Sequence, residues 1–421
     1  MKKNKRNFIK TLTTGVFAFP FLKGVRANYK PKIVIIGGGF GGGTCVKYLQ
    51  KFNDIFSITL IEREKNYYTC PFSNYVIGGF RKLEQNKFDY EKIKKSGVKV
   101  IIENVSFVDS EKKVIKFNNN ETLSYDWLIL STGVSYKWGD IEGYNEIVNK
   151  LVPHGWSGKA SKSLFDRINK LEDNSKIIIS APDYPYRCPP APYERASMIA
   201  YLLKRKGLKF KILILDSKDS FSKQKLFLRA WKELYENQIE WVPRKSGGQV
   251  VKFDYKKKAV YNSSNQKFSA DFINIIPNQK ASEIFFDSHL IEKDWCEVNP
   301  TTFELKSNKF IHVIGDSINA WDMPKSAFSA NSQGKVCAEN IKNTILEKEI
   351  LDPVFLNTCY SLASKNYAFS ISAWYRVNSD NNRIVSLGST QSKLDAQLSE
   401  RGTETKQSYA WYQNITKEIF G

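Results

Sequence analysis

Residues 32–42 read KIVIIGGGFGG, and this stretch decides the fold. Its apolar first half predicts a buried parallel strand, and the residues after the glycines follow a helical pattern. The glycines have the G-x-G-x-x-G spacing, in which a turn free of side chains lets the backbone approach a pyrophosphate at the start of a helix. They are Gly37, Gly39 and Gly42. The next predicted strand, 57–61, ends at Glu62, where a carboxylate would accept hydrogen bonds from a ribose.

Two later strands favour FAD as the bound dinucleotide. Residues 126–133 read DWLILSTG and residues 310–316 read FIHVIGD, so each apolar strand ends in a turn that contains glycine. Flavoproteins with two dinucleotide-binding domains share this pattern and place the aspartate on the ribityl chain of the flavin. The predicted cofactor residues at these turns are Thr132, Gly133, Gly315 and Asp316. Lys325 is a further candidate, because it precedes a predicted helix whose N-terminal amides could face the isoalloxazine carbonyl.

A second βαβ unit begins at residues 176–180, which read KIIIS and predict another buried strand. The fold class is therefore predicted as α/β, with two dinucleotide-binding (Rossmann-like) domains of the FAD/NAD-linked reductase type and a C-terminal segment. The predicted boundaries are 28–160 and 270–345 for a discontinuous FAD-binding domain, 161–269 for the second domain and 346–421 for the C-terminal segment.

The turn of the second unit does not suit a nucleotide. Residues 181–190 read APDYPYRCPP, and no glycine occurs from Ser175 to Lys206. Because a pyrophosphate needs glycine there, we interpret Cys188 as a redox thiol that takes the place of an NAD(P)H site. Glu194 falls in the first turn of the following predicted helix, either as a proton-transfer group or as a carboxylate that the helix dipole favours.

Two other cysteines are candidates for the site. Cys70 follows the predicted ribose-binding acid in a loop on the cofactor side of the sheet, where its thiol could touch the flavin or remain inert. Cys359 opens the C-terminal segment. Six cysteines allow 15 full pairings, so the sequence leaves the partner of Cys188 open. The cysteine and histidine spacing predicts no metal site and no haem attachment in this chain.

The charge and the first residues bear on location. The formal net charge is +21, but the lysines are dispersed, which argues against a nucleic-acid-binding face. Residues 1–27 carry seven Lys or Arg and no acid, and residues 11–22 are mostly apolar, a pattern typical of an export signal. Residues 5–10 resemble a twin-arginine signal with Lys in place of the first Arg. We therefore expect a periplasmic protein without an integral membrane segment.

Several longer motifs carry a family resemblance over essentially the whole chain. They are YYTC at 67–70, YRCPP at 186–190, PYERAS at 192–197, IHVIGD at 311–316, MPKS at 323–326, SANSQGK at 329–335, NTCYS at 357–361 and WYQNI at 411–415. With these motifs the chain resembles the flavoprotein subunit of flavocytochrome c sulfide dehydrogenase, in the family that also holds the sulfide:quinone oxidoreductases.

This resemblance implies roles for individual residues. Cys70 would bind the flavin covalently as a thioether, Trp411 would lie near the flavin, and Glu194 would help with protons. Cys188 and Cys359 would form a redox disulfide that hydrosulfide attacks, leaving a persulfide on one cysteine and a thiolate on the other. The thiolate would reduce FAD, a c-type cytochrome subunit would accept the electrons, and sulfur or polysulfide would be the product.

Three alternatives remain open at this stage. A sulfide:quinone oxidoreductase would need an apolar membrane-docking surface, which the polar stretch 393–401 does not indicate. A non-catalytic FAD-binding protein would not depend on Cys188. A thiol or disulfide reductase would normally pair a C-x-x-C or C-x₄-C motif with an NADPH site, and the sequence contains neither.

Overall fold

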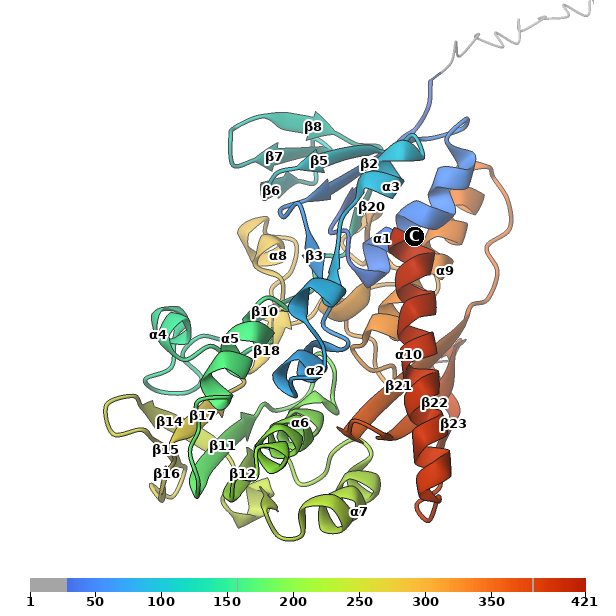
Figure 1. Ribbon diagram of the computed structural model, residues 1–421. Coiled ribbons are helices and arrows are strands. Elements are labelled where there is room, and N and C mark those ends of the chain that lie inside the picture. Colours follow the sequence, from blue (N-terminus) through green and yellow to red (C-terminus); the bar gives the residue numbers. More distant parts are fainter. Residues whose placement is uncertain (1–28, 157, 381) are drawn as a thin grey trace, which may run out of the picture.

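The computed structural model describes residues 29–156, 158–380 and 382–421. The predicted export signal at residues 1–27 lies outside this part of the chain. Two mainly parallel sheets, each with helices against it, lie one above the other in Figure 1, and an antiparallel sheet and a long helix stand beside both. This architecture confirms the predicted α/β fold with two dinucleotide-binding-like domains and a C-terminal segment.

The first sheet has the strand order β19-β20-β9-β1-β2-β5. The strands of this sheet are β1 (Lys32–Ile36), β2 (Ser57–Glu62), β5 (Lys99–Ile102), β9 (Trp127–Leu130), β19 (Glu304–Leu305) and β20 (Asn308–Val313). The strand β1 pairs in parallel with both β2 and β9, so it is buried on both sides. The helices α1 (Phe40–Leu49) and α9 (Ala327–Ile345) pack against one another beside this sheet. The strands that the two FAD motifs predicted thus lie next to the glycine-rich turn.

The second sheet has the order β13-β12-β11-β17. The strands of this sheet are β11 (Ser175–Ala181), β12 (Phe210–Asp216), β13 (Ile239–Val242) and β17 (Phe272–Ile275), and the helices that follow β11 and β12 are α6 (Ala191–Arg205) and α7 (Gln224–Tyr235). The second sheet extends past residue 269, because β17 pairs in parallel with β11 and its four residues are buried. The chain then returns through an antiparallel pair of β10 (Val134–Tyr136) and β18 (Gln279–Ala281).

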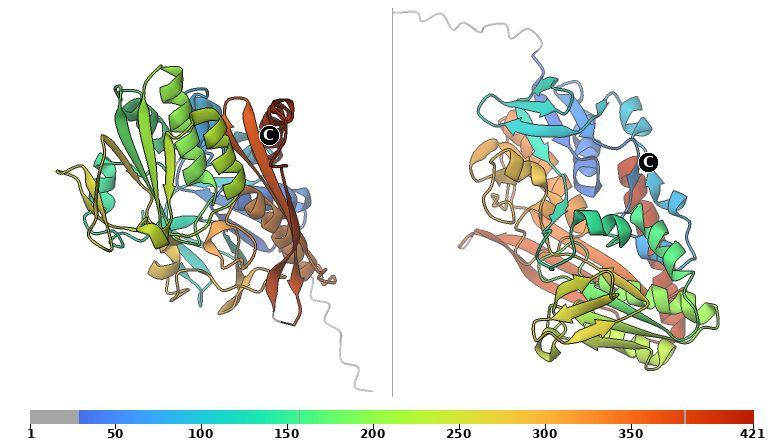
Figure 2. Two further views of the ribbon diagram at one scale, coloured as in Figure 1. Left: turned by 90° about the horizontal axis from the view of Figure 1, so that it is seen from below. Right: turned by 90° about the vertical axis from the view of Figure 1, so that its left-hand side faces the viewer.

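The C-terminal segment forms an antiparallel sheet of β21 (Val354–Ser364), β22 (Tyr367–Asn378) and β23 (Arg383–Gln391). The last helix, α10 (Leu398–Phe420), packs on β22 and runs back along the molecule to α1 (Figure 2). This helix is anchored at its far end, where Glu418 accepts hydrogen bonds from Tyr48 and Asn331. The C-terminal segment therefore contacts α1 and α9 beside the first sheet and the two helices that follow β11 and β12 in the second.

Shorter elements complete the described chain. They are β3 (Tyr67–Tyr68), α2 (Ser73–Ile77), β4 (Lys87–Phe88), α3 (Glu91–Lys95), β6 (Val105–Asp109), β7 (Val114–Phe117), β8 (Thr122–Ser124), α4 (Glu146–Leu151), α5 (Ala160–Ile168), β14 (Val250–Asp254), β15 (Ala259–Asn262), β16 (Lys267–Ser269) and α8 (Glu283–Asp287). Among the described residues, no helix combines the length and the apolar content that crossing a membrane requires.

Candidate active site

The turn between β1 and α1 brings backbone from three segments into close contact. Gly37 has a φ of +97°, and a Cβ there would lie 2.4 Å from the carbonyl oxygen of Ser131. At Gly42 a Cβ would lie 1.9 Å from the carbonyl oxygen of Gly37. A side chain fits at neither position, so both glycines are required by the close packing of strand, turn and helix. Gly39 is the N-cap of α1 and lines the cavity beside the turn.

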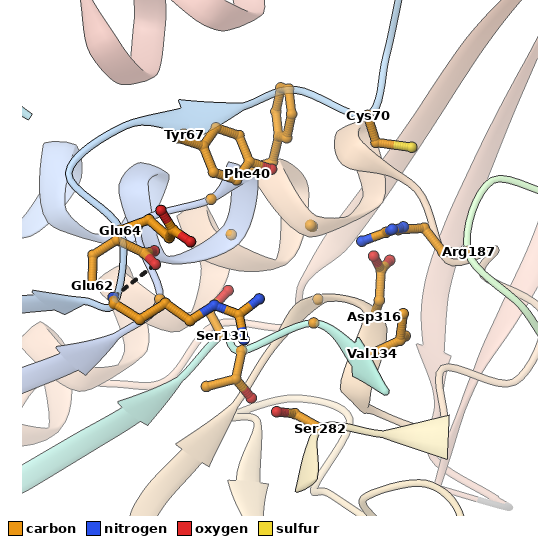
Figure 3. Close-up of a pocket in the computed structure, with 18 of the residues that line it drawn as sticks. Phe40, Glu62, Glu64, Tyr67, Cys70, Ser131, Val134, Arg187, Ser282 and Asp316 are labelled. Carbon is orange, nitrogen blue, oxygen red and sulfur yellow. Dashed lines mark hydrogen bonds between the residues drawn. The ribbon is translucent and has the colours of Figure 1, made fainter. Parts of the chain in front are cut away.

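A cavity of about 490 Å³ extends from this turn along the carboxyl ends of the first sheet (Figure 3). Glu62 lines it and accepts a hydrogen bond of 2.7 Å from the amide of Gly38. The structure brings the following predicted cofactor residues to its wall: Gly37, Gly39, Glu62, Cys70, Thr132, Gly133, Gly315 and Asp316. Gly42 lies behind the wall, where it permits the turn.

The chemistry of this wall fits FAD. The side-chain atoms Thr132 Oγ1, Asp316 Oδ1 and Arg187 Nε are buried without a hydrogen-bond partner in the described chain. Buried polar atoms are normally paired, so three unpaired ones around one long cavity indicate a polar ligand. The side chains of Arg187 and Asp316 point toward one another in Figure 3. Burial raises the pKa of Asp316, and the charges of Arg187 and Lys325 oppose that shift.

A second, smaller cavity of about 50 Å³ adjoins the first. Its wall contains the three predicted site cysteines together with Glu194 and Trp411; the cysteines are Cys70, Cys188 and Cys359. Cys70 and Cys188 line both cavities, whereas Cys359 lines only the smaller one. The fold therefore gathers three thiols from three distant parts of the sequence beside the predicted flavin site.

The turn after β11 holds Cys188 in a constrained conformation. Cys188 has a φ of +60°, a left-handed conformation that is uncommon for a residue with a side chain. Its amide donates a 2.8 Å hydrogen bond to the carbonyl of Lys325, and its carbonyl accepts one of 2.9 Å from the amide of Ala191. These bonds fix the thiol at the boundary between the two cavities, and such strain is typical of functional sites.

The thiols differ in their electrostatic surroundings. A hydrogen bond from the Cys188 thiol lowers the pKa of Cys70 to about 7, against the effect of burial and with support from Arg187. The same hydrogen bond and burial raise the pKa of Cys188, so the two thiols compete for one negative charge. Burial also raises the pKa of Cys359, and the ammonium of Lys223 opposes this.

Glu194 is fixed inside the smaller cavity. Its Oε2 accepts a 2.8 Å hydrogen bond from Asn74 Nδ2, and its Oε1 accepts one of 3.0 Å from the amide of Leu362. Burial raises the pKa of Glu194 above its usual value, which these hydrogen bonds partly offset. The carboxyl group therefore lies on the same cavity wall as the thiols, and its raised pKa favours its use in proton exchange.

Two predicted cofactor residues, Lys325 and Trp411, do not line the larger cavity. The Nζ atom of Lys325 donates to the carbonyls of Asp316 at 2.9 Å and Ile318 at 2.5 Å and lies over the ring of Trp295, outside the wall of the larger cavity. Its side chain thus supports the strand end that carries Asp316. Trp411 lines the thiol cavity, and its buried Nε1 has no hydrogen-bond partner in the part of the chain that the structure describes.

Residue-by-residue inspection of the sequence missed three members of the site: Arg187, Asn74 and Lys223. Arg187 precedes Cys188 within the quoted YRCPP motif, so the signal was present. Asn74 follows Cys70 by four residues, in the first turn of α2. For Lys223 the sequence offers no signal, because 136 residues separate it from Cys359, the thiol beside which it lies.

The strand end that could bind a second nucleotide is already occupied by protein groups. Asp216 is fully buried and pairs with Lys218 Nζ at 2.6 Å. Its other oxygen accepts hydrogen bonds from the hydroxyl of Tyr193 at 2.5 Å and from Trp241 Nε1 at 2.8 Å. A ribose could bind there only by displacing these partners. The protein's own side chains therefore satisfy the Asp216 carboxylate, which leaves no oxygen for a nucleotide.

Family models match most of the described chain. The model described as "Sulfide dehydrogenase [flavocytochrome c] flavoprotein chain, central" matches residues 161–277. The one described as "Flavocytochrome c sulphide dehydrogenase, flavin-binding" matches residues 351–420. The model "Pyridine nucleotide-disulphide oxidoreductase" matches residues 31–164. In the order given, the three matches cover the second sheet, the C-terminal segment and the glycine-rich unit of the first sheet.

Individual relatives point the same way. The flavoprotein chain of flavocytochrome c sulfide dehydrogenase from Chlorobaculum thiosulfatiphilum is 49% identical over 45 residues, which are 11% of this chain and 94% of that sequence. The mitochondrial sulfide:quinone oxidoreductase of Dictyostelium discoideum is 23% identical over 321 residues, 74% of this chain and 70% of that protein. The solved sulfide:quinone oxidoreductase of Aquifex aeolicus shares the fold, with a TM-score of 0.73 at 16% identity over 93% of this chain and 92% of that one.

The glycine-rich FAD site, the thiol cavity beside it and these matches lead to one conclusion. The chain belongs to the family of flavocytochrome c sulfide dehydrogenase flavoprotein subunits, among the sulfide-oxidising, FAD-dependent oxidoreductases that also include the sulfide:quinone oxidoreductases.

Proposed function

We propose that this protein oxidises hydrosulfide to sulfur or polysulfide through a redox disulfide between Cys188 and Cys359, and that it passes the electrons through FAD to a c-type cytochrome. The observation that carries this proposal is the single 50 Å³ cavity that both cysteines share with Glu194, next to the cofactor cavity. Among the described residues, Cys70 and Cys188 are the only thiols that border both cavities, so Cys188 is the cysteine of the proposed pair that can pass electrons on to the flavin.

The chain's own residues would organise the first step. Hydrosulfide attacks one sulfur of the disulfide, a new S–S bond forms, the old one breaks and its electron pair remains on the other cysteine. Glu194, hydrogen-bonded by Asn74 and held beside the thiols, takes the proton of the new persulfide. When bound, FAD supplies a two-electron acceptor that can release electrons one at a time.

We further propose that Cys70 is joined to the flavin by a thioether. Its support is the position of Cys70 on the wall of both cavities and the nearby charge of Arg187, which lowers the pKa of this thiol and so favours the nucleophilic thiolate. Acid denaturation tests the link. Flavin absorbance should stay with the polypeptide and should be lost into the supernatant in Cys70→Ala, whereas free FAD from the wild type would refute the thioether.

The electron acceptor needs its own experiment, because relatives named as quinone oxidoreductases share the fold. The holoenzyme is given sulfide under anaerobic conditions with either a c-type cytochrome or a quinone in lipid vesicles. We expect reduction of the cytochrome and little reduction of the quinone. Turnover with quinone alone would assign the protein to the quinone-reducing branch.

The location follows as a proposal from the basic and apolar pattern of residues 1–27. An oxidising periplasm would keep the proposed disulfide closed between turnovers. Fractionation of cells, with detection of the protein and of its shortened N-terminus, tests this.

The central test is a sulfide titration of the oxidised holoenzyme. Each equivalent of hydrosulfide should bleach the flavin absorbance, and thiol counting should show two fewer free cysteines in the oxidised protein than in the reduced one. If sulfide leaves the flavin spectrum unchanged, the protein uses FAD for another purpose, and the role as a non-catalytic flavoprotein gains support.

A further inference from the structure

A buried lysine, Lys223, lies beside Cys359. Lys223 is 4% exposed, and its Nζ lies 3.6 Å from Cys359 Sγ and 3.2 Å from the carbonyl oxygen of the same residue. It immediately precedes α7, so it comes from the second sheet's helices, whereas Cys359 lies in β21 of the C-terminal segment.

The position of Lys223 is unfavourable for a purely structural residue. It has a φ of +61°, in the left-handed region, and its cation lies at the N-terminus of a helix, where the dipole disfavours positive charge. It forms no salt bridge with any carboxylate in the described chain. Lys218, five residues earlier and equally buried, is by contrast neutralised by Asp216 at 2.6 Å.

The charges around Cys359 come from three other elements. Glu194 on α6 and Cys70 in the loop before α2 make it harder for Cys359 to become an anion, and Cys188 lies on the same cavity wall. Lys223 is the group that favours the anion. A buried cation that forms no salt bridge in the described chain and lies 3.6 Å from a thiol sulfur is suited to stabilising a negative charge that arises on that sulfur during the reaction.

We propose that Lys223 stabilises the anionic sulfur on Cys359, first as it draws hydrosulfide to that sulfur and then as it holds the resulting persulfide. This inference rests on the proposed sulfide oxidation and adds a direction to it. The sulfide sulfur bonds to Cys359 Sγ, the Cys188–Cys359 bond breaks, and the electron pair stays on Cys188. The proton of hydrosulfide passes to Glu194, so the persulfide anion beside Lys223 and the thiolate on Cys188 carry the charge.

This direction agrees with the arrangement of the two cavities. Cys188 lines the cofactor cavity and Cys359 does not, so the electron pair should end on Cys188. The sulfur that remains on Cys359 then lies in the small cavity, next to the ammonium and away from the flavin. Lys223 is thus a positioning residue for the nucleophile and a stabilising residue for its product.

The test measures anaerobic flavin bleaching by sulfide in the holoenzyme with rapid mixing. We expect Lys223→Met to slow bleaching by about 30-fold, which corresponds to the loss of a hydrogen bond to a charged group. Lys223→Arg should retain most of the rate, because it keeps the charge. The control is Lys225→Met, which removes an exposed charge from the first turn of the same helix and should leave the rate unchanged.

A second readout separates this role from a structural one. In the reduced holoenzyme, alkylation of Cys359 by iodoacetamide should follow a pH curve that Lys223→Met shifts upward by about one pH unit, since an adjacent cation lowers a thiol's pKa. The melting temperature should stay close to that of the wild type. An unchanged bleaching rate and alkylation curve would overturn the inference, and so would a rate loss that tracks unfolding. If sulfide fails to bleach the wild type, the proposed function itself is refuted instead.

Discussion

The turn after β1 and the turn after β11 occupy equivalent places in two parallel sheets, and they do opposite things. The first consists of Gly37–Gly39 and leads at once into α1, with no side chain to keep the backbone from a phosphate. The second runs from Pro182 to Pro190, contains four prolines and places Cys188 at its end. The strand-turn-helix frame is shared, and the residues of the turn decide whether it accepts a nucleotide or a thiol reaction.

The acids at the neighbouring strand ends show the same contrast. Glu62, at the end of β2, faces the larger cavity and bonds to the glycine turn. Asp216, at the end of β12, instead pairs with Lys218 and accepts hydrogen bonds from Tyr193 and Trp241. A carboxylate at this position therefore indicates a ribose site only where the turn beside it leaves room for one.

The largest expected effect tests the chemistry of the second turn. Cys188→Ser should slow flavin bleaching by sulfide by roughly 10³-fold or more, about 4 kcal/mol of activation free energy, because the disulfide no longer forms. Rapid-mixing absorbance measures it. Cys337→Ala, in the core between α1 and α9, serves as the control and should bleach normally. A serine variant that bleaches like the wild type would remove the thiol from the mechanism.

The second-largest effect is expected at the buried ion pair between Asp216 and Lys218. Lys218→Met should lower the free energy of unfolding by about 4 kcal/mol, because it leaves Asp216 buried without its ion-pair partner. The double variant with Asp216→Asn should recover much of this loss, since the uncompensated charge is gone. Denaturant unfolding of the wild type, the two single variants and the double variant gives the coupling energy. If Lys218→Met is as stable as the wild type, Asp216 carries no uncompensated charge in the variant, and its carboxyl group is protonated or reached by water.

A substitution in α1, directly behind the Gly37–Gly39 turn, should have a somewhat smaller effect on stability. Gly42→Ala should cost about 3 kcal/mol, because the added Cβ overlaps the carbonyl of Gly37, and bound FAD should fall with it. The ratio of flavin to protein absorbance after gel filtration reports the second effect. Gly402→Ala on α10, where a Cβ has open space, should instead stabilise the helix by about 0.5–1 kcal/mol. A full complement of FAD in Gly42→Ala would weaken the assignment of the turn.

Glu194→Gln should slow bleaching by about 10²-fold, the usual contribution of a positioned acid or base. Burial raises the pKa of Glu194, and the ionised form is the one that accepts a proton. The wild-type rate should therefore rise as pH increases through this raised pKa and fall below it, and the variant should lose that limb. The exposed Glu172→Gln is the control. A limb that persists in Glu194→Gln would assign it to another group.

The last prediction is that added nicotinamide nucleotides have no effect. NADH and NADPH should neither bleach the flavin nor change the melting temperature, because the second turn lacks glycine and Asp216 has no free oxygen. Difference absorbance and thermal shift at millimolar nucleotide measure this. Bleaching by either nucleotide would break the contrast between the two turns.

The larger cavity could be predicted from the sequence because its main residues are local. Gly37, Gly39 and Glu62 belong to one βαβ unit, and Gly315 with Asp316 end a recognisable strand. Lys325 shows the limit of this reasoning. Its place before α9 was predicted, but its side chain turns to the carbonyls of Asp316 and Ile318, and no residue pattern indicates which way a long flexible side chain turns.

The thiol cavity required the folded chain. The sequence by itself determined the α/β class, the glycine turn, the acid that follows it and the absence of a second nucleotide turn, because these depend on backbone conformation and side-chain size over a few neighbouring residues. Only the tertiary structure placed Cys70, Cys188 and Cys359 on one wall, filled the Asp216 site and set Lys223 beside Cys359. Those contacts join β21, α7 and two loops, and such long-range contacts are decided by packing of whole elements, which carries no local signature.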